Sequence, residues 1–154
     1  PGAKVSYTIT VTNTGQFAYT AASPAKFTDD MSDVLDDATY NNDATQGATL
    51  SGTALTWTGA LGIGQTVKVT YSVTVNNPDT GNGRLINKVD PPVDGGGSCD
   101  PSGSCDTSTP ITPPAPGTGL AFTGSDIVAP GIIALLLLGG GAAFVLIRRR
   151  RATE

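Results

Sequence analysis

Residues 4–12 read KVSYTITVT and alternate strictly between polar and apolar side chains. In an extended chain, one face of this stretch would carry Val5, Tyr7, Ile9 and Val11. A period of two in a stretch rich in β-branched residues is typical of a half-buried β-strand. Residues 66–75, TVKVTYSVTV, show the same alternation over a longer stretch. Both segments therefore predict strands with one face toward a core.

Shorter segments between and beyond these two stretches complete the pattern of an all-β domain. Two short strands are expected within residues 49–58, and a last strand over residues 84–89. One or two helical turns are expected over residues 29–37, where apolar residues recur at helical spacing. The apolar residues at this helical spacing are Met31, Val34 and Leu35. We expect core side chains at Phe17, Tyr19, Phe27 and Trp57. Short strands joined by short connections predict an antiparallel two-sheet sandwich over residues 1–90.

The composition indicates an extracellular β protein and excludes several kinds of site. The 154 residues include 20 Gly and 22 Thr, 14% are charged, and no His occurs. Without His there is no His-dependent catalytic triad and no His metal site, so we expect neither an enzyme nor a cofactor. Residues 1–126 carry twelve Asp against five Lys and Arg, a net charge of −7. Because this region would repel phosphate, nucleic acid is not expected as a partner.

Residues 127–147 form an uncharged run of 21 residues, IVAPGIIALLLLGGGAAFVLI. A helix of this length spans about 30 Å, the thickness of a bilayer core, so the run predicts a transmembrane helix. Residues 148–154 begin with four Arg, which would form a cytoplasmic tail and place the bulk of the chain outside. Residues 91–119 are rich in Pro, Gly and Thr and predict a disordered stalk. The chain starts without an export signal, so we expect it to be the C-terminal part of a longer secreted precursor.

Between the expected stalk and the apolar run lies the sequence Leu120-Ala121-Phe122-Thr123-Gly124. This array of spacer, short motif, apolar run and Arg tail resembles the cell-wall sorting signal of Gram-positive surface proteins. In that family a membrane transpeptidase, sortase, cleaves Leu-Pro-x-Thr-Gly between Thr and Gly and joins the Thr to peptidoglycan through an acyl-enzyme. The resemblance implies that Thr123 becomes linked to the wall and that Gly124 onward stays in the membrane. With Ala121 in place of Pro, the motif is similar to the Leu-Ala-x-Thr-Gly signals of class E sortases of actinobacteria.

Two other roles are compatible with the same features. The chain could be an uncleaved single-pass membrane protein with an extracellular binding domain, or it could present a catalytic domain that lies upstream. The fate of the bond between Thr123 and Gly124 separates the first of these from wall anchoring. No aromatic cluster or convergent set of polar residues identifies an extracellular ligand.

The folded part also resembles a known group of proteins. The segments GAKVSYTITVTNTG, FTDDMSDVLDDATYNNDA, LTWTG and GQTVKVTYSVTV look like the repeated domains of uncharacterised actinobacterial surface proteins. These domains are related to the immunoglobulin-like repeats of bacterial stalks and adhesins. The resemblance implies an immunoglobulin-like β-sandwich over residues 1–90 with a spacer or adhesive role and no known ligand.

Two groups of residues raise the question of a disulfide or a metal. Cys99 and Cys105 are separated by five residues, and in an exported protein such a pair predicts a disulfide. Two thiols without His or further Cys cannot complete a tetrahedral zinc site. An acidic group could hold calcium, but its spacing does not fit a calcium-binding loop, so capping and a solvated face are the favoured interpretation. Its members are Asp29, Asp30, Asp33, Asp36, Asp37 and Asp43. No metal site is predicted.

Some sandwich domains of pilins and adhesins join a Lys to an Asn, with an acidic residue as catalyst. Lys4 on the first strand, Asn87 on the last and Asp29 between them are the analogous residue types. The alternation places Lys4 on the polar face, whereas such a bond requires buried and desolvated partners. The isopeptide bond is therefore a secondary hypothesis for these three residues.

Overall fold

The two alternating stretches form long neighbouring strands near the centre of one sheet. A computed structural model describes residues 1–92, 97–100, 105–112 and 130–137. Strand β1 (Lys4–Asn13) runs antiparallel to β6 (Thr66–Val75). Both strands lie as the alternation predicts, because the four inward residues of β1 are buried and β6 buries Val69, Tyr71, Val73 and Val75.

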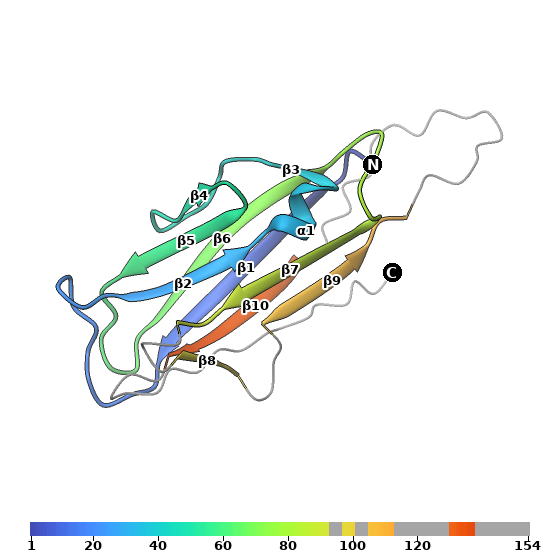
Figure 1. Ribbon diagram of the computed structural model, residues 1–154. Helices are drawn as coiled ribbons and strands as arrows, with labels where there is room; N and C mark the ends of the chain where they lie inside the picture. The colour runs from blue at the N-terminus through green and yellow to red at the C-terminus, as the bar shows by residue number, and fades with distance from the viewer. Residues whose placement is uncertain (93–96, 101–104, 113–129, 138–154) are drawn as a thin grey trace.

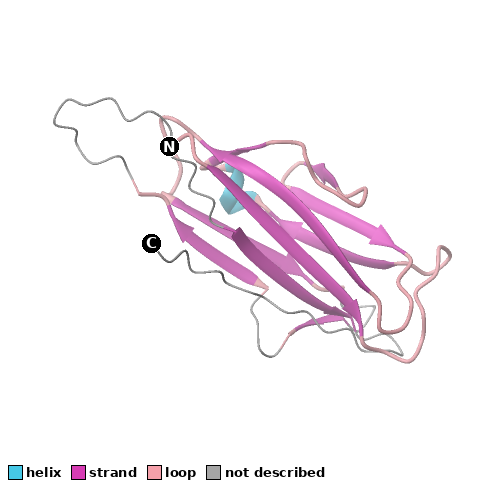
Figure 2. Ribbon diagram, turned by 180° about the vertical axis from the view of Figure 1, so that it is seen from behind, coloured by secondary structure: helices cyan, strands magenta, loops and turns pink. Residues whose placement is uncertain are grey.

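In the described part of the chain, ten strands form two sheets. The sheets pack face to face, as Figures 1 and 2 show from opposite sides. The first sheet has the order β3 (Ala38–Tyr40), β6, β1, β10 (Pro130–Leu137) and β8 (Gly97–Cys99). The second has the order β4 (Thr49–Ser51), β5 (Ala54–Gly59), β2 (Ala25–Asp30), β7 (Arg84–Asp90) and β9 (Asp106–Pro110). Neighbouring strands are antiparallel except β1 and β10, which are parallel. The prediction of an all-β sandwich is confirmed.

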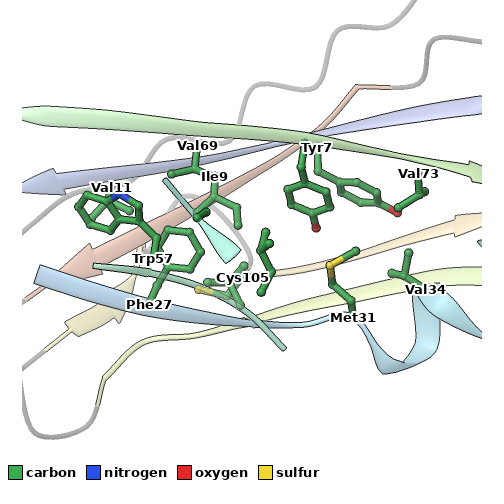
Figure 3. Packing of buried hydrophobic residues seen from close by; sticks show 14 of the residues in the cluster. Tyr7, Ile9, Val11, Phe27, Met31, Val34, Trp57, Val69, Val73 and Cys105 are labelled. Carbon is green, nitrogen blue, oxygen red and sulfur yellow. The ribbon is translucent and has the colours of Figure 1, made fainter. Parts of the chain in front are cut away.

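The facing sides of the two sheets enclose one hydrophobic core (Figure 3). Phe27 on β2 and Trp57 on β5 lie side by side, with ring centroids 5.9 Å apart. The expected helical turn is α1 (Ser32–Leu35), which closes one end of the core with Met31 and Val34. Removing these apolar side chains from water is the main source of stability for such a fold.

The prediction that Phe17 lies in the core is wrong, because its side chain is 66% exposed. The cause lies in the backbone of the loop after β1. The buried Asn13 amide donates hydrogen bonds to the carbonyl oxygens of Phe17 (2.8 Å) and Leu61 (3.0 Å), and its oxygen accepts one from the Gly15 N–H (3.0 Å). Asn13 thus organises the loop through main-chain groups, and the Phe17 ring is left outside.

Strands β8 and β9 lie within the segment for which the sequence predicts a stalk. β9 pairs antiparallel with β7, from Arg84 opposite Pro110 to Lys88 opposite Asp106, and Ile111 packs against the core. An edge strand needs main-chain partners more than apolar side chains, so the polar sequence DTSTP gives no alternation to detect. Pro110 stands at the end of the strand, where its missing N–H costs little. The sandwich therefore continues past residue 90.

Strand β10 differs from the helix predicted over residues 127–147. It runs along β1 from Ser6 opposite Pro130 to Asn13 opposite Leu137, in the orange strand of Figure 1. A short apolar run cannot be assigned to strand or helix from its pattern alone, and the edge of β1 satisfies its main-chain groups. Among the described residues, the helical structure is confined to the four residues of α1, so none of it could cross a bilayer.

Our first prediction concerns Gly81, whose backbone lies close to the Asp37 carboxylate. The buried Asp37 carboxylate accepts hydrogen bonds from the Gly83 N–H (3.2 Å) and the Arg84 N–H (3.0 Å) at the start of β7. A Cβ on Gly81 would overlap this carboxylate. We expect Gly81→Ala to lower the free energy of unfolding by about 1–3 kcal/mol in urea titrations. The control Thr80→Ala, at an exposed position of the same loop, should change it by less than about 0.5 kcal/mol; equal effects would contradict the proposed overlap.

Candidate functional site

A carboxylate lies inside the core, where an apolar side chain would be expected. β2 alternates buried and exposed residues, and this alternation turns Ala25, Phe27 and Asp29 inward. The Asp29 side chain is 0% exposed, and its Oδ2 accepts a hydrogen bond of 2.7 Å from the hydroxyl of Tyr71 on β6. Its Oδ1 has no hydrogen-bond partner among the described residues. The Tyr71 hydroxyl thus holds Asp29 through Oδ2.

Asn87 lies beside Asp29 on the neighbouring strand. Asp29 is opposite Val89 in the register of β2 and β7, and Asn87 lies two residues from Val89 on the same face of β7. Asn87 is fully buried and close enough to Asp29 to lower the pKa of that carboxyl. Neither polar atom of its amide makes a hydrogen bond of standard geometry to a described residue. The two strands therefore bring together a buried acid and a buried amide.

Two tyrosines of the other sheet complete the cluster, which we call the polar cluster: Asp29, Asn87, Tyr7 and Tyr71. Tyr7 and Tyr71 face each other in the register of β1 and β6, and their rings stack at 5.0 Å. Figure 3 shows Tyr7 extending from β1 into the space between the sheets. The Tyr7 hydroxyl is buried and has no hydrogen-bond partner in the described part of the chain.

Burial dominates the electrostatics of the polar cluster. Desolvation raises the pKa of Asp29 to about 7, against opposing effects from the Tyr71 hydrogen bond and the Asn87 amide. Desolvation, and then the neighbouring Asp29, raise the pKa of Tyr71 well above its usual value, and the same two causes raise the pKa of Tyr7. Asp29 can therefore hold or release a proton near neutral pH, while both phenols stay protonated.

Lys4 is not part of this cluster. Its side chain is 58% exposed, and Nζ lies 3.5 Å from Oδ2 of Asp43 on the outer face of the first sheet. The structure thus joins Asp29 and Asn87, two of the three residues of the isopeptide hypothesis, and separates the third. The sequence predicted that Lys4 would be separate, because the alternation of residues 4–12 places it on the polar face of the strand. The tyrosine hydroxyls were missed, since Tyr7 and Tyr71 were considered only as apolar surface.

The cysteines form the predicted disulfide. The Sγ atoms of Cys99 and Cys105 are 2.04 Å apart, and Cys105 packs into the core. The carbonyl oxygen of Cys105 accepts a hydrogen bond of 2.9 Å from the Val89 N–H, so the bridge is tied to β7. The disulfide therefore fastens the end of β8 to the strand that carries Asn87.

The acidic residues considered for calcium have separate structural roles. Asp30 accepts a hydrogen bond from the Ser32 N–H at the start of α1 (3.0 Å), and Asp43 accepts one from the Ser72 N–H (2.8 Å). Among the residues that the structure describes, no group of three or more acidic or sulfur side chains is arranged to hold a metal ion. Residues 120–124, the expected sorting motif, lie outside the described residues.

Comparison with known proteins adds one family. Residues 1–113 match the domain of unknown function DUF7927. This range includes β9 and ends just after Ile111, in agreement with the extent of the sandwich. No curated protein and no solved structure matches the chain.

Proposed function

Since the chain belongs to the DUF7927 family of domains of unknown function, we propose a function from the order of its own features. The sandwich acts as a structural module, a stalk or binding unit, on the outside of a Gram-positive cell, and a sortase joins Thr123 to peptidoglycan. The observation that carries the proposal is the sequence order: a folded module, the motif at 120–124, the uncharged run at 127–147 and then four Arg. Each part has the position that sorting requires.

The folded module suits such a role. Its disulfide fits an oxidising compartment outside the cytoplasm. The outward residues of its long strands are mostly Thr and Ser, as in the exposed face of β1. A solvated sandwich that buries a hydrophobic core and holds its end with a disulfide suits the role of a spacer.

The chemistry of attachment is carried out by the sortase and not by this chain. Its cysteine thiolate attacks the carbonyl carbon of Thr123, and the amine of Gly124 leaves. An amine of the peptidoglycan precursor then displaces the enzyme and forms a new amide with Thr123. Ala121 in the second position of the motif favours a class E-like sortase. In this proposal the chain contributes the substrate peptide and no catalytic group to sorting.

In this proposal the uncharged run at residues 127–147 has two alternative environments, which exclude each other. Before sorting, residues 127–147 form the membrane helix, because a bilayer offers a larger apolar environment than one strand edge. Away from a bilayer, residues 130–137 satisfy their main-chain groups as β10 along β1. Cleavage after Thr123 removes this segment from the module in either case.

A pair of variants tests the proposal in the full-length protein produced in its host. We expect Thr123→Ala to move the protein from the wall fraction, released by a muralytic enzyme, to the membrane fraction. Thr118→Ala is the matched control, because Thr118 also precedes a glycine but lies outside the motif. Wild type and control should stay in the wall. Wall attachment that survives Thr123→Ala would contradict the proposal, and a wild type found only in membranes would favour the uncleaved single-pass protein.

A further inference from the structure

The loop between β6 and β7, residues 76–83, contains an asparagine that is followed by a glycine. The loop lies beside α1 at one end of the sandwich (Figure 1). Asn82 is exposed, and among the seven asparagines of the sequence it alone precedes a glycine. The side-chain amide of an asparagine can be attacked by the main-chain nitrogen of the next residue, and glycine hinders this attack least because it has no side chain. Asn82 and Gly83 are therefore the pair in this chain that is most open to such a reaction.

Both ends of the Asn82 amide are held by hydrogen bonds. Its Oδ1 accepts a hydrogen bond from the Arg84 N–H (2.9 Å), and its Nδ2 donates one to Oδ2 of Asp36 (3.1 Å). Because Oδ1 reaches the N–H two residues along the chain, the side chain folds back over the peptide group between them. The amide carbon Cγ is thus held beside the main-chain nitrogen of Gly83. The Arg84 N–H also stabilises the negative charge that forms on Oδ1 when a nucleophile attacks Cγ.

The attacking nitrogen has a base in contact with it. The Gly83 N–H donates a hydrogen bond to Oδ1 of the buried Asp37 (3.2 Å), and Oδ2 of Asp37 shares the Arg84 N–H with Asn82 (3.0 Å). An amide nitrogen attacks only as its proton leaves, and a carboxylate within hydrogen-bond distance can accept that proton. The φ of Gly83 is +74°, a conformation that residues with a side chain rarely adopt. Nucleophile, base and electrophile therefore already lie next to one another in the folded chain.

We propose that Asn82 is a self-modifying site, at which the folded loop converts the asparagine to aspartate or isoaspartate through a cyclic imide with Gly83. The fold accelerates the conversion, because it holds the reacting atoms together and supplies the Asp37 carboxylate as the base. The same sequence in an unfolded chain lacks both advantages and reacts more slowly. The conversion takes place within this chain and does not depend on the attachment proposed for Thr123.

The reaction balances with solvent water as its co-reactant. Asp37 takes the proton of the Gly83 N–H, the nitrogen bonds to Cγ of Asn82, and the Cγ–Nδ2 bond breaks. The proton passes from Asp37 to the departing nitrogen, and ammonia leaves behind a five-membered imide. Water then adds to one of the two imide carbonyl groups. Opening at Cγ gives aspartate at position 82, whereas opening at the main-chain carbonyl gives isoaspartate, and neither step requires an oxidant or a reductant.

The product places a further negative charge where carboxylates are already close together. Nδ2 of Asn82 donates to Asp36, and after conversion a carboxylate faces Asp36 in its place. Asp79 lies in the same loop, and its pKa is raised, first of all by a side-chain hydrogen bond with Asp37. Like charges at such short separations repel one another. Conversion of Asn82 therefore lowers the stability of the loop that joins β6 to β7.

The rates of conversion in the folded and the unfolded chain test the proposal. Purified full-length protein is kept at neutral pH, either folded in buffer or unfolded in guanidinium chloride, and is followed by peptide mapping with mass spectrometry. We expect aspartate and isoaspartate to form at position 82 at least about 10-fold faster in the folded chain. Asn41, which is exposed and precedes Asn42, is the internal control and should stay unconverted over the same period. A folded chain that converts Asn82 no faster than the unfolded chain would overturn the proposal.

Two variants separate the effect of the base from that of the Asn-Gly sequence itself. Asp37→Asn removes the base and should reduce the folded rate to within about threefold of the unfolded rate. The matched control Asp33→Asn, on α1 and outside these hydrogen bonds, should leave the rate unchanged. A folded Asp37→Asn chain that converts as fast as wild type would overturn the proposal. If circular dichroism shows that Asp37→Asn does not fold, the comparison of folded and unfolded wild type decides the matter.

The effect on stability is measured without waiting for the reaction. Asn82→Asp carries the aspartate product from the start, and we expect it to unfold at a lower urea concentration than wild type. Raising the salt concentration should reduce this difference, because salt screens the repulsion between exposed carboxylates. Equal urea midpoints at low salt would overturn the inferred loss of stability.

Discussion

Replacing Asp29 with Asn is expected to stabilise the chain by roughly 2–4 kcal/mol at pH 8 and to change its stability little at pH 4. Burial raises the pKa of Asp29 in the folded state to about 7, whereas an unfolded Asp has a pKa of 3.8. Between these values the folded chain binds a proton that the unfolded chain has lost. The stability contribution of Asp29 therefore falls as pH rises through this window and is lowest above pH 7.

Urea titrations of wild type and Asp29→Asn at pH 4, 6 and 8 measure this effect. Asn keeps an oxygen for the Tyr71 hydroxyl and removes the charge, so the difference between the two proteins isolates the ionisation. The control is Asp30→Asn on the same strand. The Ser32 hydrogen bonds lower the pKa of Asp30, which is exposed, so this variant should be slightly less stable at pH 8. A loss of stability at pH 8 in Asp29→Asn would show that the Asp29 carboxylate has a buried cationic partner.

Truncation of Trp57 is expected to have the largest effect on the core. Trp57 is only 5% exposed and stacks on Phe27 across the paired strands β5 and β2. A Cβ on Gly59 would overlap the indole ring, so the glycine two residues after Trp57 leaves room for it. We expect Trp57→Ala to lower the free energy of unfolding by about 3–5 kcal/mol, measured in urea.

Phe17→Ala provides the matched comparison for this aromatic truncation. Its ring is 66% exposed, so the variant should differ from wild type by less than about 0.5 kcal/mol. Similar losses for Trp57 and Phe17 would contradict the position that the structure assigns to one of the two rings.

The central part of the fold was predictable because its signal is strong and local. β1 alternates over residues 4–12 and β6 over residues 66–75, and an alternation of that length determines which face is buried. The strands that follow residue 90 were not predictable in this way. β9 is polar on both faces, and its place follows from the main-chain groups that β7 offers. Residues 130–137 are apolar throughout, so their pattern carries no period that separates a strand from a helix.

The candidate site was only partly visible in the sequence. Asn87 could be named from its residue type and its place on the expected last strand, and Asp29 from its residue type and its place between the expected first and last strands. Their closeness depends on the pairing of β2 with β7, which no local pattern encodes. The alternation of residues 4–12 predicted that Lys4 is exposed, and the structure confirms this exposure. The two tyrosine hydroxyls belong to the site because β1 and β6 place their rings against each other.

Mass spectrometry of the mature protein, released from the host wall by a muralytic enzyme, tests the central claim most directly. Our account predicts a C-terminal peptide that ends at Thr123 and carries a peptidoglycan fragment on its carboxyl group. A chain that is intact through Glu154 and is found only in the membrane fraction would contradict it.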